Sequence, residues 1–232
     1  MESLYQRKSM RVYEDREIPE EMKKLILKAA SQAPTAGCQQ LYTILDITDQ
    51  KLKEALSESC DHQPFIAKAP MVLVFCADCK KWYDAYLEAG CEPRKPGVGD
   101  LMLAVTDTVI AAQNAVVAAE SLGLGSCYIG DIVENFEIHK ELLNLPPQVA
   151  PLCMLVFGYP TQQQKERKQT TRFAKSSIVF ENRYRELSEE ELLEMMPNDR
   201  TKAFYNRKYV SDFAQEMVRS TKEIYKNWNS KE

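Results

Sequence analysis

The longest apolar segment of the chain, residues 100–122, constrains the fold more than any other feature. Across 101–119 the only formally charged residue is Asp107. As a lone charge on a buried helix, it is expected to make a structural hydrogen bond or ion pair. A surface helix carries a charged stripe, whereas a helix that is apolar nearly all round is buried. About 22 helical residues span roughly 33 Å, the width of a small domain, and Gly123 suits the left-handed residue that ends a helix. The segment therefore predicts a buried central helix, covered by other helices or by a second subunit.

Composition limits the class of protein. The chain has 232 residues, of which 44% are apolar and 28% charged, values typical of a globular protein with a sizeable core. A formal net charge of −4 excludes a broad nucleic-acid-binding surface. No run approaches 18 uninterrupted apolar residues and the start lacks a secretory signal, so we expect no membrane partner. Seven cysteines, an odd number, fit a reduced compartment and predict a cytoplasmic protein.

Hydrophobic periodicity predicts a mixture of helices and strands without strict βαβ alternation, and so an α+β fold rather than a doubly wound sheet. The expected strands are 41–48, 69–76, 126–130, 151–158 and, far from the others in sequence, 176–180. The expected helices are 19–33, 51–56, 80–89, 100–122, 137–143, 188–196 and a final one with Phe213, Met217, Ile224 and Trp228 on one face.

Several familiar catalytic motifs are missing from the sequence. There are only two histidines, and neither a Gly-x-Ser-x-Gly elbow, a phosphate-binding Gly-x-x-x-x-Gly-Lys loop nor a Gly-x-Gly-x-x-Gly fingerprint occurs. A triad hydrolase, a P-loop nucleotidase and a Rossmann dehydrogenase are therefore disfavoured. We predict no catalytic protein side chain, and expect that a bound cofactor carries the chemistry of any enzyme built on this chain.

Three segments have the residues to hold such a cofactor. Residues 7–11 offer two guanidinium groups, an ammonium and a hydroxyl, the donors that a phosphate monoester needs. The loop 34–40 combines small residues with hydroxyl and amide groups, which suits a flat heteroaromatic ring. The segment 165–175 has five basic residues against one acid and could close over a phosphate. A solvated arm, an ordinary loop and a solvated linker remain the respective alternatives.

The cysteines admit a second hypothesis, a zinc or cysteine redox module. Cys76 and Cys79 form a Cys-x-x-Cys pair with Cys60, His62 and Cys91 nearby in sequence. The second pair usual for structural zinc is absent, and the pair does not open the helix that a thioredoxin-like motif requires. We therefore predict no metal site.

In combination, the motifs resemble the FMN-dependent nitroreductase superfamily, and within it the NADPH-preferring, oxygen-insensitive nitroreductase and flavin reductase group. The resemblance covers about residues 4–184 in register, which is more specific than any single motif. The segments that carry it are 7–11, 33–40, 63–70, 74–78, 107–114, 118–125, 128–130, 158–160, Arg172 and 181–182.

The resemblance implies an α+β homodimer with a mixed, largely antiparallel sheet flanked by helices. The long central helix would lie at the dimer core, and the strand at 176–180 would be exchanged with the partner's sheet. FMN would lie at the subunit interface. Residues 1–187 would form the FMN-binding domain, and 188–232 a C-terminal helical excursion that packs on the same domain or on the dimer partner.

The family's cofactor-binding residues carry over by position. The FMN phosphate and ribityl chain would be held by Arg7, Ser9 and Arg11 with Lys8 as a helper, and by Arg172. The family's lysine two residues earlier is Thr170 here, so Lys168 is the candidate substitute. The flavin ring would contact Thr35, Ala36, Gly37 and Cys38. It would also form a hydrogen bond with Gln63 and contact backbone groups of Tyr128, Ile129 and Gly130. Relatives often have serines or an asparagine where this chain has Cys38.

The implied activity is hydride transfer from NADPH, or NADH, through FMN to nitroaromatics, quinones or free flavin, with ping-pong kinetics. The acceptor would be a small aromatic or quinone-like molecule. Arg207 and Lys208 are candidates for the 2′-phosphate of NADPH, or else ordinary surface charges. The alternative function is a flavin-binding or flavin-carrier protein without turnover.

Overall fold

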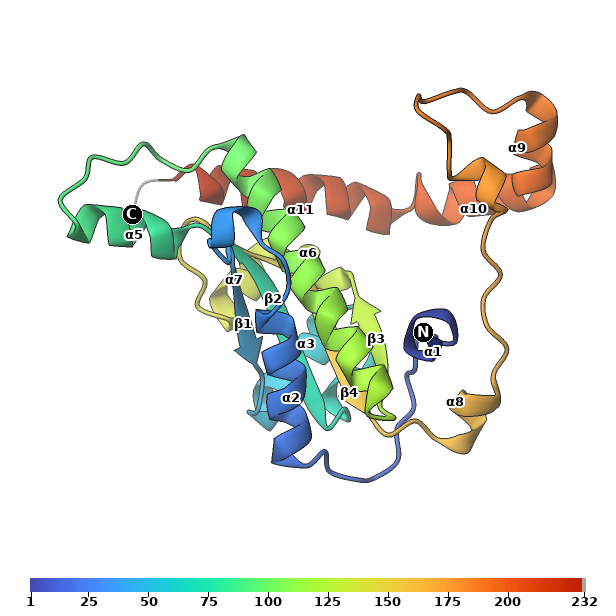
Figure 1. Ribbon diagram of the computed structural model, residues 1–232, viewed down its shortest axis with the longest axis horizontal. Helices are drawn as coiled ribbons and strands as arrows, with labels where there is room; N and C mark the ends of the chain where they lie inside the picture. Colours follow the sequence, from blue (N-terminus) through green and yellow to red (C-terminus); the bar gives the residue numbers. More distant parts are fainter. Residues whose placement is uncertain (231–232) are drawn as a thin grey trace.

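The computed structural model describes residues 1–230, so the last two residues of the expected excursion 188–232 lie outside the described part. Its centre is a four-stranded sheet with every neighbouring pair antiparallel and the order β1–β2–β4–β3 (Figure 1). Tyr42 lies opposite Ala77, Met71 opposite Phe157, and Gly125 opposite Gly158. The strands are β1 (Tyr42–Asp46), β2 (Met71–Asp78), β3 (Gly125–Ile129) and β4 (Val149–Gly158).

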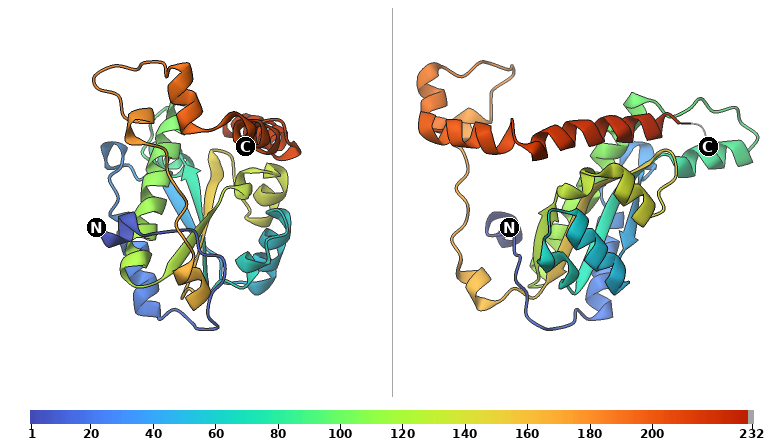
Figure 2. Two further views of the ribbon diagram at one scale, coloured as in Figure 1. Left: turned by 90° about the vertical axis from the view of Figure 1, so that its right-hand side faces the viewer. Right: turned by 180° about the vertical axis from the view of Figure 1, so that it is seen from behind.

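Helices cover both faces of this sheet, which confirms the α+β prediction (Figure 2). All eight residues of β2 are buried, as its unbroken apolar run predicts. Alternate residues of β2 enter different clusters: Leu73 and Phe75 pack with one helical layer, and Val72 and Val74 with the other. The first layer is α2 (Glu20–Ser31) and α6 (Val98–Ser121), and the second is α3 (Gln50–Ser59), α4 (Pro64–Ala67) and α7 (Phe136–Leu142).

The predicted central helix is α6, but one of its sides is open to solvent. Residues at helical spacing bury its inner face against α2 and the sheet: Ala104, Asp107, Thr108, Ala111, Ala112, Ala115, Val116 and Ala119. On the outer face Met102, Leu103 and Val109 are 61%, 48% and 47% exposed. Other elements of this chain therefore cover only one face of the helix, and cover of the outer face by a second subunit stays a prediction.

Helix α6 also has the length and apolarity of a membrane-spanning helix. Its contacts identify it as a core helix instead. Its inner face packs on the sheet, and the buried carboxylate of Asp107 receives hydrogen bonds from residues 35–41. Such a fully paired carboxylate is what allows a charge to be buried in a protein core.

The C-terminal part leaves the sheet and returns to it. After β4 come α8 (Gln162–Glu166) and a long connection. The next helices, α9 (Glu189–Met195) and α10 (Asn198–Lys208), lie apart from the sheet in Figure 1. Helix α11 (Asp212–Trp228) then crosses back, and Ile224 and Trp228 are buried against Leu41, Ala77 and Phe136. Two outlying helices complete the described chain: α1 (Glu2–Tyr5) and α5 (Lys80–Glu88).

The strand expected at 176–180 does not form in the described chain. The segment begins with a 3-10 turn, η3 (Lys175–Ser177), and the amide of Val179 bonds back to the carbonyl of Lys175 at 2.8 Å. Ile178 and Val179 are 61% and 56% exposed. A strand requires a neighbouring strand for its backbone hydrogen bonds, and none of residues 1–230 supplies one here. Exchange of this segment with a second subunit stays a prediction.

Candidate functional site

The N-terminal arm lies along the edge of the sheet. The amide of Met10 donates to the carbonyl of Ser126 on β3 at 2.8 Å, and Ser9 forms an isolated parallel bridge with Ser126. Two glycines make this close approach possible. A Cβ at Gly125 would lie 2.6 Å from Cγ of Met10, and a Cβ at Gly158 would lie 2.6 Å from Cγ of Tyr13. The arm is therefore held against β3 and β4 by shape as well as by hydrogen bonds.

The arm meets the basic segment that follows β4. The ammonium of Lys8 donates to the carbonyl of Lys165 at 2.6 Å and to that of Arg167. The guanidinium of Arg167 donates to the carbonyl of Ser9. The buried Gln164 accepts a hydrogen bond from the amide of Arg11 at 3.2 Å. Segments about 155 residues apart in sequence thus form one basic surface beside β3.

This surface has unused hydrogen-bond donors of the kind that bind phosphate. Nε of Arg7 and Oγ of Ser126 are buried and have no hydrogen-bond partner among the described residues. Buried polar groups are rarely left unpaired, so such atoms indicate a place for a polar ligand. Burial raises the pKa of Glu120 on α6, while the nearby charges of Arg7 and Lys8 lower it. The donor set fits the phosphate of FMN.

Residues expected to meet the flavin ring lie beside this basic surface. Nε2 of Gln63 donates to the carbonyl of Cys60 at 2.8 Å and to Oδ2 of Asp131 at 3.2 Å. Asp131 begins the short helix η2 (Asp131–Val133) directly after Gly130, so Gln63 adjoins the end of β3. The guanidinium of Arg11 lies 6.0 Å from the ring of Phe65 on α4, which links the arm to the same region.

The side chains at the end of β3 face inward, away from any ligand. Ile129 is buried, and the hydroxyl of Tyr128 donates to Oε1 of Gln113 on α6 at 3.3 Å. Burial raises the pKa of Tyr128. Gly130 is exposed, and no atom lies within 4 Å of a Cβ built on it. This strand end can therefore offer a ligand its backbone groups, the role predicted for it, but not its two large side chains.

The ring-lining loop 35–38 occupies a different place. Asp107 of α6 anchors it by accepting hydrogen bonds from the hydroxyl of Thr35 at 2.5 Å, the amide of Ala36 at 2.9 Å and the amide of Leu41 at 3.2 Å. These bonds confirm the expected structural role of Asp107. Gly37 and Cys38 have left-handed backbone conformations, with φ of 55° and 57°, and Cys38 is exposed.

The single chain does not bring this loop together with the basic surface. Asp107, which holds the loop, and Glu120, which lies near Arg7, are 13 positions apart on α6. At 1.5 Å per residue these positions are about 20 Å apart along the helix. The predicted site residues therefore form two separate groups: one comprises Arg7, Lys8, Ser9, Arg11, Gln63 and the end of β3, and the other Thr35, Ala36, Gly37 and Cys38.

The remaining predicted phosphate ligands are exposed. Lys168 lies between Arg167 and Gln169, both of which bond to carbonyls of the arm. Arg172 donates to the carbonyl of Thr170 at 3.1 Å and forms no bond to the arm among the described residues. Their roles in binding the cofactor stay predictions. The contacts with the arm come instead from Gln164, Arg167 and Gln169, none of which was predicted as a site residue.

The two candidate NADPH residues differ in their surroundings. The guanidinium of Arg207 lies 5.4 Å from the ring of Phe204 on its own helix, at the far end of α10. Lys208 is close enough to Glu134 to lower the pKa of that carboxyl. Burial and the charges of Asp131, Asp61 and Glu216 outweigh this effect and raise the pKa of Glu134 to about 7. Lys208 thus approaches the η2 side of the site.

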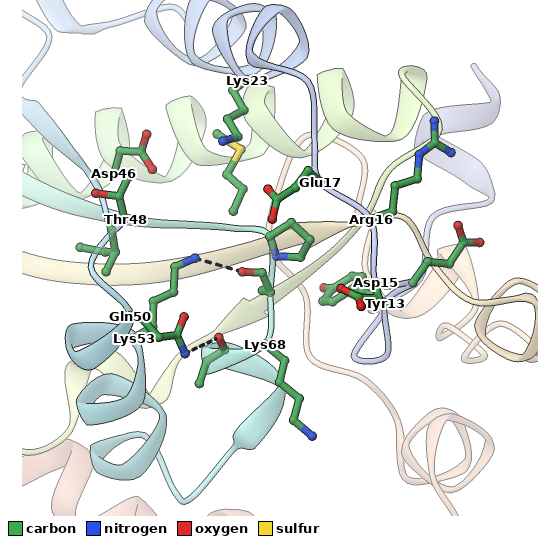
Figure 3. Close-up of a pocket in the computed structure, with 16 residues that line it drawn as sticks. Tyr13, Asp15, Arg16, Glu17, Lys23, Asp46, Thr48, Gln50, Lys53 and Lys68 are labelled. Carbon is green, nitrogen blue, oxygen red and sulfur yellow. Dashed lines mark hydrogen bonds between the residues drawn. The ribbon is translucent and has the colours of Figure 1, made fainter.

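Two cavities in the described part of the chain are lined by none of the predicted site residues. A polar cavity of about 680 Å³ lies between residues 13–17, α3 and α4, and Figure 3 shows its charged lining. The most buried charged residue of this lining is Lys53, whose ammonium donates a hydrogen bond to the carbonyl of Ala69 at 3.2 Å. A second cavity, of about 410 Å³, lies beside α5 and includes Gln39, whose carbonyl accepts the indole N–H of Trp82 at 2.7 Å.

The zinc and cysteine redox hypothesis gains no support from the geometry. Within residues 1–230, no three His, Cys, Asp or Glu side chains are grouped to hold a metal ion. Cys76 and Cys79 are both buried, and burial raises the pKa of each thiol, that of Cys79 to about 12. A redox-active cysteine needs a thiolate near neutral pH, so the raised pKa values do not favour a redox role for this pair.

The fold and the site together define an α+β protein that can hold a phosphate-bearing aromatic cofactor at a sheet edge. The chain belongs to the nitroreductase family, whose model matches residues 4–159. It is 36% identical over 190 residues to the oxygen-insensitive NADPH nitroreductase of Salmonella typhimurium, covering 82% of this chain and 76% of the relative. It is 30% identical over 209 residues to an FMN reductase (NADPH) of Bacillus subtilis, covering 89% and 83%.

Solved structures agree with the fold. A nitroreductase from B. subtilis superposes with a TM-score of 0.84 at 26% identity, covering 98% of this chain and 97% of that one. The NADPH:FMN oxidoreductase of Vibrio harveyi, solved in complex with NAD+, superposes with a TM-score of 0.82 at 24% identity, covering 97% and 96%. At that level of identity the second similarity supports the fold alone.

Proposed function

We propose that this protein is an NADPH-dependent FMN flavoenzyme that reduces nitroaromatics, quinones or free flavin. One observation carries the proposal: the arm 7–11 and the segment 164–169 converge on β3, and the buried Nε of Arg7 finds no hydrogen-bond partner within residues 1–230. The family relatives named above are reductases of this kind.

Each residue of the site has its own role in binding the cofactor. Arg7 and Arg11 supply charge for the phosphate, and Arg167 adds a guanidinium while it holds the arm through Ser9. Lys8 uses its ammonium to tie the two segments together. Gly130 offers its backbone to the ring. When bound, FMN supplies the two-electron carrier between NADPH and the acceptor. NADPH and the acceptor would bind at this site in turn, which would give ping-pong kinetics.

We also propose that the working unit is a homodimer. The 20 Å separation along α6 supports this, because loop 35–38 of one chain can complete the site only if it comes from a second copy. The apolar outer face of α6 supports it too, since exposed apolar patches of this kind mark association surfaces. In the dimer, residues 176–180 of each subunit would pair with the partner's sheet, and 188–232 would pack as an excursion on domain 1–187 or on its partner.

For the reductant, we propose that Lys208 and Arg207 contact the 2′-phosphate of NADPH. Lys208 is the better placed, because its charge acts on Glu134 next to η2, while its ammonium lies 4.6 Å from the centre of the Phe213 ring. Replacing Arg207 or Lys208 with alanine is expected to raise the Michaelis constant for NADPH far more than that for NADH. Equal changes for the two coenzymes would remove the role. The seven free cysteines support a reducing, cytoplasmic setting for the enzyme.

The proposal is tested with the purified protein. We expect a yellow protein that releases FMN on heating, bleaches on anaerobic addition of NADPH, and recovers its colour when a nitro compound or quinone is added. A bound flavin that stays oxidised under NADPH would instead support a flavin carrier. Colourless protein that binds no added FMN would contradict both functions.

A further inference from the structure

The orientation of the Gln63 side chain is fixed by its neighbours. A primary amide has two N–H donors and one carbonyl oxygen. Both donors of Gln63 are in use, one on the carbonyl of Cys60 at 2.8 Å and one on Oδ2 of Asp131 at 3.2 Å. A carbonyl and a carboxylate can only accept, so the flipped amide would set oxygen against oxygen at both contacts. The partners therefore dictate the orientation.

The backbone of Gln63 is held as firmly as its side chain. Its amide donates to the carbonyl of Ser57 at 2.9 Å, and its carbonyl accepts the hydroxyl of Ser57 at 2.8 Å. The preceding Asp61 and His62 are both in left-handed conformations, which turn the chain sharply between α3 and α4. Gln63 is thus presented at the end of β3 by a rigid corner of the molecule.

One group of this amide remains available to a ligand. Within residues 1–230 no group donates a hydrogen bond to Oε1 of Gln63. An oxidised isoalloxazine ring has a single N–H, at N3, whereas its O2, O4, N1 and N5 atoms accept. An amide that offers only its oxygen can bond to the N–H and would repel the acceptors.

We propose that Asp131 is a positioning residue that makes Gln63 an obligate hydrogen-bond acceptor, so that Gln63 binds the flavin at its N3–H edge. The inference rests on the proposed FMN site and specifies which edge of the ring this corner recognises. Without the carboxylate of Asp131, the bond to the carbonyl of Cys60 still fixes the amide, but its second N–H is released, so Gln63 offers a ligand a donor as well as an acceptor.

The test compares binding of FMN and of N3-methyl-FMN to the apoprotein, followed by quenching of flavin fluorescence. The methyl group removes the only ring donor, so the wild-type protein is expected to bind the analogue roughly 10-fold or more weakly. Asp131→Leu is expected to bind the two flavins within about 3-fold of each other. Asp131→Asn, which keeps an accepting oxygen, restores the discrimination.

Glu134→Gln is the matched control, because it removes a neighbouring charge without touching Gln63, and it should discriminate as the wild type does. Equal affinity of the wild-type protein for both flavins would overturn the inference and leave the FMN site intact. Full discrimination in Asp131→Leu would overturn the role of Asp131. Failure to bind either flavin would instead refute the proposed function itself.

Discussion

At the scale of single residues, the site depends on groups that bind protein rather than ligand. Asp107 is the clearest case: it is buried in α6 and accepts three hydrogen bonds from residues 35–41. Its position in an apolar segment of the sequence indicated a structural bond. The identity of its partners required the folded chain, because Thr35 is 72 residues away in sequence.

Gly158 is predicted to be essential for docking of the arm. In Gly158→Ala the new Cβ would overlap the ring of Tyr13 at 2.6 Å, so the arm must shift. We expect a loss of about 1–3 kcal/mol in the free energy of unfolding, measured by urea denaturation, together with weaker FMN binding. Gly99→Ala is the control, because its Cβ meets nothing within 4 Å. Equal stability of the two variants would contradict the prediction.

Glu134 is predicted to make stability fall with rising pH. Its pKa is raised from 4.5 to about 7, chiefly by burial and then by Asp131 and Asp61. Between these values the native protein retains a proton that the unfolded chain has lost, so the free energy of unfolding decreases as pH rises through this window. Below pH 4.5 both states are protonated and the penalty is absent.

Glu134→Gln removes this ionisation. At pH 8 the variant is expected to be more stable than the wild type by about 1 kcal/mol, allowing for solvent screening of a partly exposed group. At pH 4.5 the difference should vanish. Urea denaturation at both pH values measures it, with the exposed Glu190→Gln as control. Parallel stability profiles of wild type and variant would show that Glu134 titrates normally.

At the scale of elements, the arm and the segment after β4 act as one unit. Arg167→Ala removes both a guanidinium and the bond to the carbonyl of Ser9. We expect FMN affinity to fall roughly 10-fold or more, as for loss of a charged hydrogen bond, in fluorescence titrations of the apoprotein. Arg183→Ala, outside this contact, should bind FMN normally. Unchanged affinity in Arg167→Ala would mean that this segment does not take part in the site.

The sequence predicted the four strands that pair within the chain, because their apolar or β-branched runs are local signals. It predicted α2, α5, α6 and α7 because the spacing of apolar residues along a helix is also a local signal. The strand at 176–180 has a similar composition but no partner in the described chain, and Ile178 and Val179 are exposed. Composition indicates that a segment can form a strand, whereas only a neighbouring strand edge can satisfy its backbone.

At the scale of the whole molecule, the outer face of α6 is predicted to hold two copies together. Val109→Glu places a charge in this apolar surface, where Val109 is 47% exposed in the single chain. We expect monomers in analytical ultracentrifugation and loss of bound FMN, because a single chain does not bring the two groups of site residues together. Leu25→Glu, on the exposed side of α2, is the control and should remain dimeric and yellow. A dimeric Val109→Glu protein would contradict this arrangement.

The sequence by itself determined the α+β class, the burial of β2 and β4, the long apolar helix α6 and the three segments whose side chains suit a cofactor. These follow from local periodicity and from the chemistry of neighbouring side chains. Only the tertiary structure decided which segments meet. It joined the arm to Gln164 and Arg167, fixed Gln63 against Asp131, and separated loop 35–38 from the arm along α6. Such contacts depend on how the chain closes long loops, which no local pattern encodes.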